Sequence, residues 1–148
     1  MGGEVIEHYN GERGSIQSEE LMRQPTDFSG MLFEGRKGYK NVTPTDVDGF
    51  VQLAKEQIFI FFELKYSGDM PEGQKTALCS LVDALDEGGY KTTLILAIHG
   101  TKAPGTIKAK NARAVKYYYK HKWYDITREM RTLYQTMNGF LEFTRRKQ

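Results

Sequence analysis

The fold is decided by residues 58–65, which read Ile-Phe-Ile-Phe-Phe-Glu-Leu-Lys. A short run rich in β-branched and aromatic side chains predicts a strand. Because side chains alternate across a strand, Phe59, Phe61, Glu63 and Lys65 share one face. Burying a carboxylate or an ammonium is costly unless the group is paired or bound to a metal. We therefore expect Glu63 and Lys65 where a buried strand opens into a polar cleft; the alternative is a surface ion pair at an ordinary strand end.

The residues before this strand predict its hairpin partner. Residues 46–53 are expected to form a strand, residues 55–57 a turn, and the two strands an antiparallel pair. Asp46 and Asp48 share a face of the first strand, so acids from both strands can converge. Asp48 is the better inward candidate. Asp46 lies nearer the mouth, where an aspartate that caps a turn is an equally good interpretation.

Further elements are expected on both sides of the hairpin. They are a short helix beginning near Ser18, a helix over 73–85 that ends at Gly88-Gly89, a central strand over 91–98, a long strand or a hairpin over 112–124, and a helix over 126–143. This order predicts an α/β fold in which helices flank a mixed central β-sheet. We expect a single domain over residues 1–148, with a flexible N-terminus at 1–14.

Both long helices show apolar stripes at helical spacing. Gln74 begins the first of them on the stripe of Leu78, Leu81 and Leu85, so its side chain is expected to face the sheet. The alternative is a glutamine near the helix N-terminus that has no role in a site. The stripe of the second helix comprises Ile126, Met130, Leu133, Met137 and Phe140.

The charge distribution and the composition limit the possible functions. Residues 1–100 hold 9 Lys/Arg and 16 Asp/Glu, whereas residues 101–148 hold 12 and 3. An acidic front and a basic back suit a carboxylate site beside a surface that binds a polyanion, although a solvated basic tail is an equal alternative. The first residues lack the pattern of a secretory signal, and the lone cysteine, Cys79, fits a reducing compartment. We therefore expect a cytoplasmic protein.

Together, Asp48, Glu63-Leu64-Lys65 and Gln74 resemble the pattern of the PD-(D/E)XK nuclease superfamily. In that pattern an Asp starts one strand of a hairpin, (Asp/Glu)-x-Lys lies on the next, and a helix follows, often with a Gln at its start. The resemblance covers about residues 18 to 98. It is closest to small phage-type and Holliday-junction-resolvase-like members, and it implies a restriction-endonuclease-like core. Leu78 stands where the exonuclease-like branch often carries a Tyr, which argues against that branch.

The resemblance also implies hydrolysis of DNA phosphodiester bonds with Mg²⁺, for which Mn²⁺ can substitute. Such a hard cation prefers oxygen ligands and supplies a nucleophilic water at neutral pH. Asp48, Glu63 and the main-chain carbonyl of Leu64 would bind it. Asp46 and Glu20 are further ligand candidates.

The same resemblance gives Lys65 and Gln74 places in the catalytic set. Lys65 would position or deprotonate water and stabilise the developing negative charge. A different class of function remains open, namely a non-catalytic nucleic-acid-binding module that keeps the nuclease fold. A structural or assembly protein with an incidental acid pair is a third, weaker alternative. A homodimer would suit cleavage of both strands, but no interface stripe identifies one.

Residues 115–124 combine lysines with aromatic side chains. Read as an unbroken strand, they place Lys116, Tyr118, Lys120, Lys122 and Tyr124 on one face. Lysine rows bind phosphates, and exposed aromatic rings can stack on unpaired bases. We therefore predict DNA contact by Lys116, Tyr118, Lys120 and Lys122. The alternative is an edge strand that its lysines protect from aggregation.

Overall fold

The computed structural model describes residues 45–100 and 105–146, which belong to one compact unit, Thr45–Gln148. The predicted helix near Ser18, the flexible segment 1–14 and Glu20 lie outside the described residues, and the single domain over 1–148 stays a prediction. The elements are β1 (Gly49–Leu53), β2 (Ile58–Lys65), α3 (Glu72–Glu87), β3 (Lys91–Ile98), a 3₁₀ turn (Ala109–Asn111), β4 (Arg113–Tyr119), β5 (Lys122–Asp125), a second 3₁₀ turn (Thr127–Glu129) and α4 (Leu133–Arg146).

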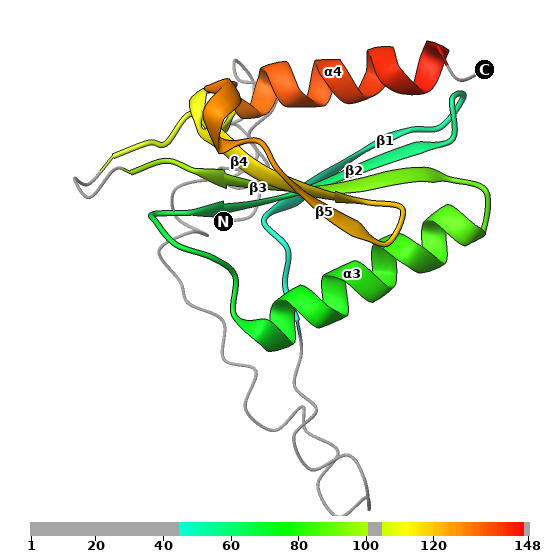
Figure 1. Cartoon of the computed structure of the whole chain (residues 1–148), viewed down its shortest axis with the longest axis horizontal. Coiled ribbons are helices and arrows are strands. Elements are labelled where there is room, and N and C mark those ends of the chain that lie inside the picture. Colours follow the sequence, from blue (N-terminus) through cyan, green and yellow to red (C-terminus); the bar gives the residue numbers. More distant parts are fainter. Residues whose placement is uncertain (1–44, 101–104, 147–148) are drawn as a thin grey trace, which may run out of the picture. The chain divides into compact units, whose positions relative to one another are not determined.

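The five strands form one mixed sheet in the order β1-β2-β3-β4-β5. β2 and β3 are parallel and are joined through α3, whereas the other neighbouring pairs are antiparallel. Figure 1 shows α3 on one face of the sheet and α4 on the other. The predicted α/β class, with a mixed sheet between helices, is confirmed, and the predicted central strand is β3, whose residues 92–97 are all buried.

β2 spans the residues that the sequence predicted, and its two faces are as expected. Ile58 and Ile60 pack in the core beneath α4, with Phe62 and Leu64 against it. Phe59 and Phe61 pack on the opposite side, in the core beneath α3. Because alternation continues to the end of the strand, Glu63 lies on the α3 side.

α3 is longer than predicted, and its buried stripe differs by one position. Leu78 and Val82 are buried against the sheet, but Leu81 is 42% exposed, so its place in the predicted stripe was wrong. The i, i+4 spacing of Leu78 and Val82 continues back to Gln74, which keeps Gln74 on the sheet side. The helix ends as expected: Gly89 has φ +99°, a conformation that glycine adopts without strain.

The segment 112–124 is a hairpin, and the predicted lysine face was wrong. Lys120 and His121 form a two-residue turn with φ values of 51° and 66°, which reverses the chain between β4 and β5. Residues opposite each other across this turn share a face, so unbroken alternation from residue 115 to 124 does not apply. Tyr118 pairs with Trp123 on the α3 side, whereas Tyr119 pairs with Lys122 on the α4 side.

The predicted helix over 126–143 is also divided. Met130 has φ 55° and is 61% exposed, so it interrupts the helix and is absent from the apolar stripe. α4 begins afresh after Thr132, whose hydroxyl accepts a hydrogen bond from the Gln135 main-chain N–H (3.1 Å). The Gln135 side chain accepts one in return from the Thr132 N–H (3.0 Å). This reciprocal cap explains the new start.

No helix within residues 45–100 or 105–146 combines the length and the apolar character needed to cross a membrane.

Candidate active site

The candidate site lies where β1 begins and β2 ends. The last pair of the β1–β2 ladder is Gly49 with Phe62, so Asp48 comes opposite Glu63 one step beyond it. Gly49 makes this approach close, because a Cβ on it would lie 2.5 Å from the tip of the Phe62 ring. The predicted strand over 46–53 therefore starts three residues late, and Asp48 lies in the bend that leads into it.

Two hydrogen bonds fix the acids to each other's strands. The Asp48 main-chain N–H donates to Glu63 Oε1 at 2.8 Å. The Leu64 main-chain N–H donates to Asp48 Oδ2 at 2.7 Å. Each carboxylate is thus held by the backbone beside the other, which brings two negative charges together.

Glu63 is the buried member of the pair, with 2% of its surface exposed. Burial raises the pKa of Glu63, and the nearby Asp48 carboxylate raises it further. The hydrogen bond from the Asp48 N–H and the charge of Lys65 oppose this rise but do not cancel it. A carboxylate in this state gains from any additional positive charge.

Lys65 and Gln74 complete the cluster. Lys65 Nζ lies 3.7 Å from Glu63 Oε2 and donates a long hydrogen bond to Gln74 Oε1 (3.4 Å). The Gln74 side-chain amide donates in turn to the carbonyl oxygen of Asp46 (3.2 Å) and lies 3.5 Å from its carboxylate. Gln74 therefore connects the start of α3 to Lys65 and to the segment before β1.

The structure brings together five of the predicted site residues, namely Asp46, Asp48, Glu63, Lys65 and Gln74. Asp46 contacts Gln74, so its carbonyl and carboxylate meet α3. His99 lies at the same edge of the sheet, since its main-chain N–H donates to the Lys65 carbonyl (3.0 Å).

The predicted nucleic-acid residues do not form one row. Lys116 pairs with Asp69, and Lys120 pairs with Asp86 of α3 (2.8 Å). Tyr118 is only 7% exposed, and its hydroxyl donates to Asp83 (2.9 Å). Lys122 lies on the opposite face of the hairpin, over the Tyr124 ring.

A cluster that the sequence did not predict lies beside the site. Lys75, the residue after Gln74, pairs with Asp69 at 2.8 Å, and both Lys75 and Lys116 lie over the Trp123 ring at 5.7 and 4.7 Å. Burial would raise the pKa of Asp69, but hydrogen bonds from Lys116 and Lys75 outweigh it and lower the pKa to about 2. The position of Lys75 next to Gln74 was the available signal, but Lys116 and Trp123, the other members of the cluster, are distant from Lys75 in the sequence.

The donor atoms of the site fit a hard divalent cation. Asp48 and Glu63 offer carboxylate oxygens, which such cations prefer. The Leu64 N–H points to Asp48, and in a strand the carbonyl of the same residue points to the same side, beyond the end of the β1–β2 ladder. No cluster of three or more His, Cys, Asp or Glu side chains suited to a metal occurs among the described residues, so the ligand set rests on two carboxylates and a carbonyl.

Cys79 of α3 lies near this region without sharing its chemistry. It is a free, half-buried thiol. Burial raises the pKa of the Cys79 thiol to about 11, and Asp83 contributes to the rise. A thiol of this kind is not a nucleophile at neutral pH.

The chain matches no family model, no curated protein and no solved structure. Its own geometry therefore carries the functional argument.

Proposed function

We propose that the protein is a metal-dependent nuclease that hydrolyses DNA phosphodiester bonds, with a core of the restriction-endonuclease type. The observation that carries the proposal is the buried Glu63 carboxylate, held beside the Asp48 carboxylate by main-chain hydrogen bonds and next to Lys65. Two adjacent acids in a partly desolvated position are unfavourable by themselves and favourable around a cation.

In this proposal Asp48, Glu63 and the Leu64 carbonyl hold Mg²⁺ or Mn²⁺, which lowers the pKa of water and offsets charge on the phosphate. Lys65 stabilises the negative charge that develops on the phosphate oxygens and holds the attacking water. Gln74 fixes the Lys65 ammonium through its amide oxygen. The side chains thus divide into cation ligands, a charge-stabilising lysine and a positioning amide.

The neighbouring Lys75 and Lys116 supply the polyanion surface that the proposal needs. Both lie on the α3 side of the sheet, as does Glu63, and both lie over Trp123. Their shared partner Asp69 holds them in place and is itself 44% exposed, so a phosphate can compete for them. This pair, with Trp123, replaces the predicted row as the proposed DNA contact.

The proposal is tested with linear, nicked, single-stranded and branched DNA in the presence of Mg²⁺ or Mn²⁺. Glu63→Gln and Lys65→Ala should each lower cleavage by about 10²–10⁴-fold. Glu87→Gln and Lys55→Ala are matched controls, since these residues carry the same groups at an exposed helix end and in the β1–β2 turn. If neither site variant changes cleavage, the site is wrong.

A parent protein that binds DNA in a salt-sensitive manner but never cuts it would favour the second candidate, a binding module that keeps the nuclease fold. The Lys75 and Lys116 cluster gives this candidate a surface of its own. In that case Lys116→Gln weakens binding and reduces its salt dependence, while Glu63→Gln leaves both unchanged.

A further inference from the structure

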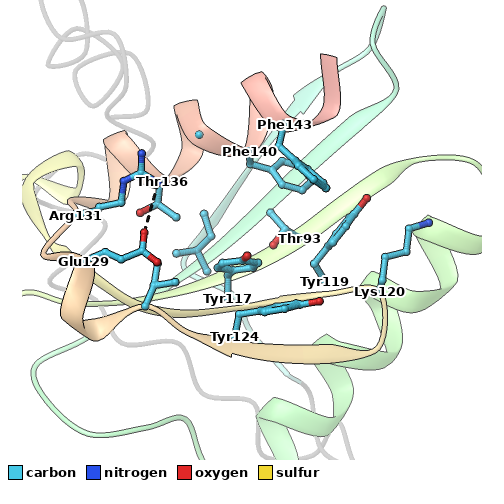
Figure 2. Close-up of a pocket in the computed structure, with 13 residues that line it drawn as sticks. Thr93, Tyr117, Tyr119, Lys120, Tyr124, Glu129, Arg131, Thr136, Phe140 and Phe143 are labelled. Carbon is cyan, nitrogen blue, oxygen red and sulfur yellow. Dashed lines mark ion pairs between the residues drawn. The ribbon is translucent and has the colours of Figure 1, made fainter. Parts of the chain in front are cut away.

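A cavity lies on the opposite face of the sheet from Glu63, between β3, β4, β5 and α4. Its volume is ≈ 410 Å³, within the range of about 300–1,000 Å³ usual for small-molecule sites. Figure 2 shows Tyr117, Tyr119, Tyr124 and Phe140 around the same space, with Arg131 and Glu129 at one end and Lys120 at the other. The cavity is therefore aromatic along its length and charged at its ends.

Gly139 makes room for Arg131 in the wall of this cavity. It lines the cavity from the middle of α4, where glycine is less favourable than alanine for helix stability. A Cβ at Gly139 would lie 3.2 Å from Arg131 Nη1, so the guanidinium occupies the space above the missing side chain. The two buried threonines that line the cavity, Thr93 and Thr136, are also small.

The aromatic walls present both ring faces and ring edges. Tyr117 and Tyr124 are stacked, with centroids 5.0 Å apart and an interplanar angle of 19°. Tyr119 meets Phe140 and Phe143 edge-on, at 5.4 and 5.7 Å. Burial raises the pKa of Tyr117 and of Tyr119, so both phenols stay neutral and can donate hydrogen bonds. Such walls suit a flat ring with polar edges.

Arg131 is the cation that a ligand can engage. Its only side-chain ion pair within the described residues is with Glu129 at 3.7 Å, and both side chains are about half exposed. Lys120, in contrast, is bound to Asp86 at 2.8 Å. The Arg131 carbonyl accepts a hydrogen bond from the Ala114 N–H (2.9 Å), which fixes the backbone beneath the guanidinium. A guanidinium so placed can bind a phosphate with two parallel hydrogen bonds.

We propose that this cavity binds a nucleoside monophosphate unit, with the base among Tyr117, Tyr119 and Tyr124 and the phosphate on Arg131. The unit is either a free mononucleotide or the phosphorylated end of a nucleic acid chain. Because the cavity and Glu63 lie on opposite faces of the sheet, this site is separate from the proposed catalytic site and does not depend on it.

The probes are AMP, GMP, CMP and dTMP, titrated into the full-length protein by calorimetry and by ligand-observed NMR. At least one should bind at 1:1 stoichiometry, and its nucleoside should bind at least about 10-fold more weakly because the phosphate contact is lost. Gly139→Leu fills the cavity, and Arg131→Gln removes the cation; each should weaken binding by about 10-fold or more. Arg128→Gln is the matched control, since Arg128 is a neighbouring exposed arginine that does not line the cavity.

Thermal melting of each variant shows whether it folds, and Gly139→Ala provides a milder change that also displaces Arg131. An oligonucleotide with a 5′-phosphate, compared with the same chain without it, distinguishes the two sources of the unit. The proposal is overturned if no mononucleotide saturates the protein at millimolar concentration, or if the folded Gly139 and Arg131 variants bind as the parent does. Binding of indole-3-acetate with no binding of any mononucleotide also overturns it, because the phosphate then has no role.

Discussion

Two antiparallel hairpins flank the central strand β3, and they differ in the charges that lie opposite each other across their strands. In the second hairpin, Lys116 of β4 lies opposite Asp125 of β5 in the strand register, and its ammonium forms an ion pair with Asp69. In the first, Asp48 comes opposite Glu63, so two acids face each other where β1 begins and β2 ends. Opposite charges across neighbouring strands stabilise a sheet, whereas like charges destabilise it.

Under the proposed function, the difference separates a hairpin built for stability from a hairpin built to hold a cation. A hairpin selected for stability alone gains nothing from placing a second acid beside the buried Glu63. The first hairpin nevertheless holds both acids with backbone hydrogen bonds, which keeps them together despite their repulsion. This is the arrangement expected where a bound cation restores the balance of charge.

The largest expected effect comes from replacing one aspartate by asparagine in each hairpin and comparing the two variants. Asp48→Asn should lower metal-dependent cleavage by at least about 10²-fold and raise the Mg²⁺ concentration needed for half-maximal rate, because a cation ligand is lost. Asp125→Asn makes the same chemical change in the second hairpin and should leave both quantities unchanged. Equal effects of the two substitutions would remove the functional distinction between the hairpins.

The second prediction concerns what stabilises the second hairpin. Burial raises the pKa of Tyr118 to about 12 from its ordinary value of 10.0, and the hydrogen bond to Asp83 adds to the rise. Because the folded pKa is the higher one, this stabilisation is complete below pH 10 and is lost as the pH rises to 12. The free energy of unfolding should fall by about 2–3 kcal/mol over that window. In the Tyr118→Phe variant, the free energy of unfolding, measured with urea, should fall less between pH 10 and pH 12. An equal fall in the variant and the parent would contradict the attribution of this pH dependence to Tyr118.

The grouping of Asp48, Glu63 and Lys65 was predictable because these residues follow the alternation of side chains along a strand. Alternation along β2 places Glu63 and Lys65 on one face, and the short turn after β1 brings Asp48 opposite them. The main-chain hydrogen bonds that hold the carboxylates were not predictable, since they depend on where the ladder stops. Gly49 carried a readable signal, because a glycine within a strand often marks a close approach of another group.

A hairpin over 112–124 was one of two open alternatives and a helix over 126–143 was expected, but the position of the turn and the break in the helix were not predictable, because single residues reverse or interrupt the chain there. Lys120, His121 and Met130 all adopt positive φ, although none is glycine, asparagine or aspartate. Sequence patterns assign such conformations to those residue types, so the turn and the helix break gave no signal. Because the lysine face was predicted for an unbroken strand without this turn, the prediction placed Lys122 on the wrong face of the sheet.

The third prediction is that the first hairpin is stabilised by losing its acid. Glu63→Gln should raise the free energy of unfolding of the metal-free protein by roughly 0.5–2 kcal/mol while cleavage is lost, as is common when a costly functional group is removed. The raised pKa of Glu63 means that its ionised form is penalised in the folded protein at neutral pH. The gain should therefore shrink as the pH falls towards the ordinary value of 4.5, where the parent carboxyl is protonated. If Glu63→Gln lowers the free energy of unfolding at pH 7 while Glu87→Gln leaves it unchanged, the Glu63 carboxylate is stabilised by its neighbours and the prediction is wrong.

The smallest expected effect comes from the turns. Lys120 and His121 both have positive φ in the two-residue turn of the second hairpin, whereas the first hairpin has one such residue, Gln57. Replacing Lys120 and His121 by Asn and Gly should raise the free energy of unfolding by about 1 kcal/mol, because Asn-Gly suits this turn without strain. This gain is net of two losses: the Lys120 ion pair, whose partner Asp86 is only 10% exposed, and the contact of His121 with Asp83 at 3.3 Å. Gln57→Gly should give a smaller gain in the first hairpin, and Glu56→Gly, at a position without positive φ, should give none. A gain from Glu56→Gly equal to that from Gln57→Gly would show that chain flexibility, not relief of backbone strain, sets the stability of these turns.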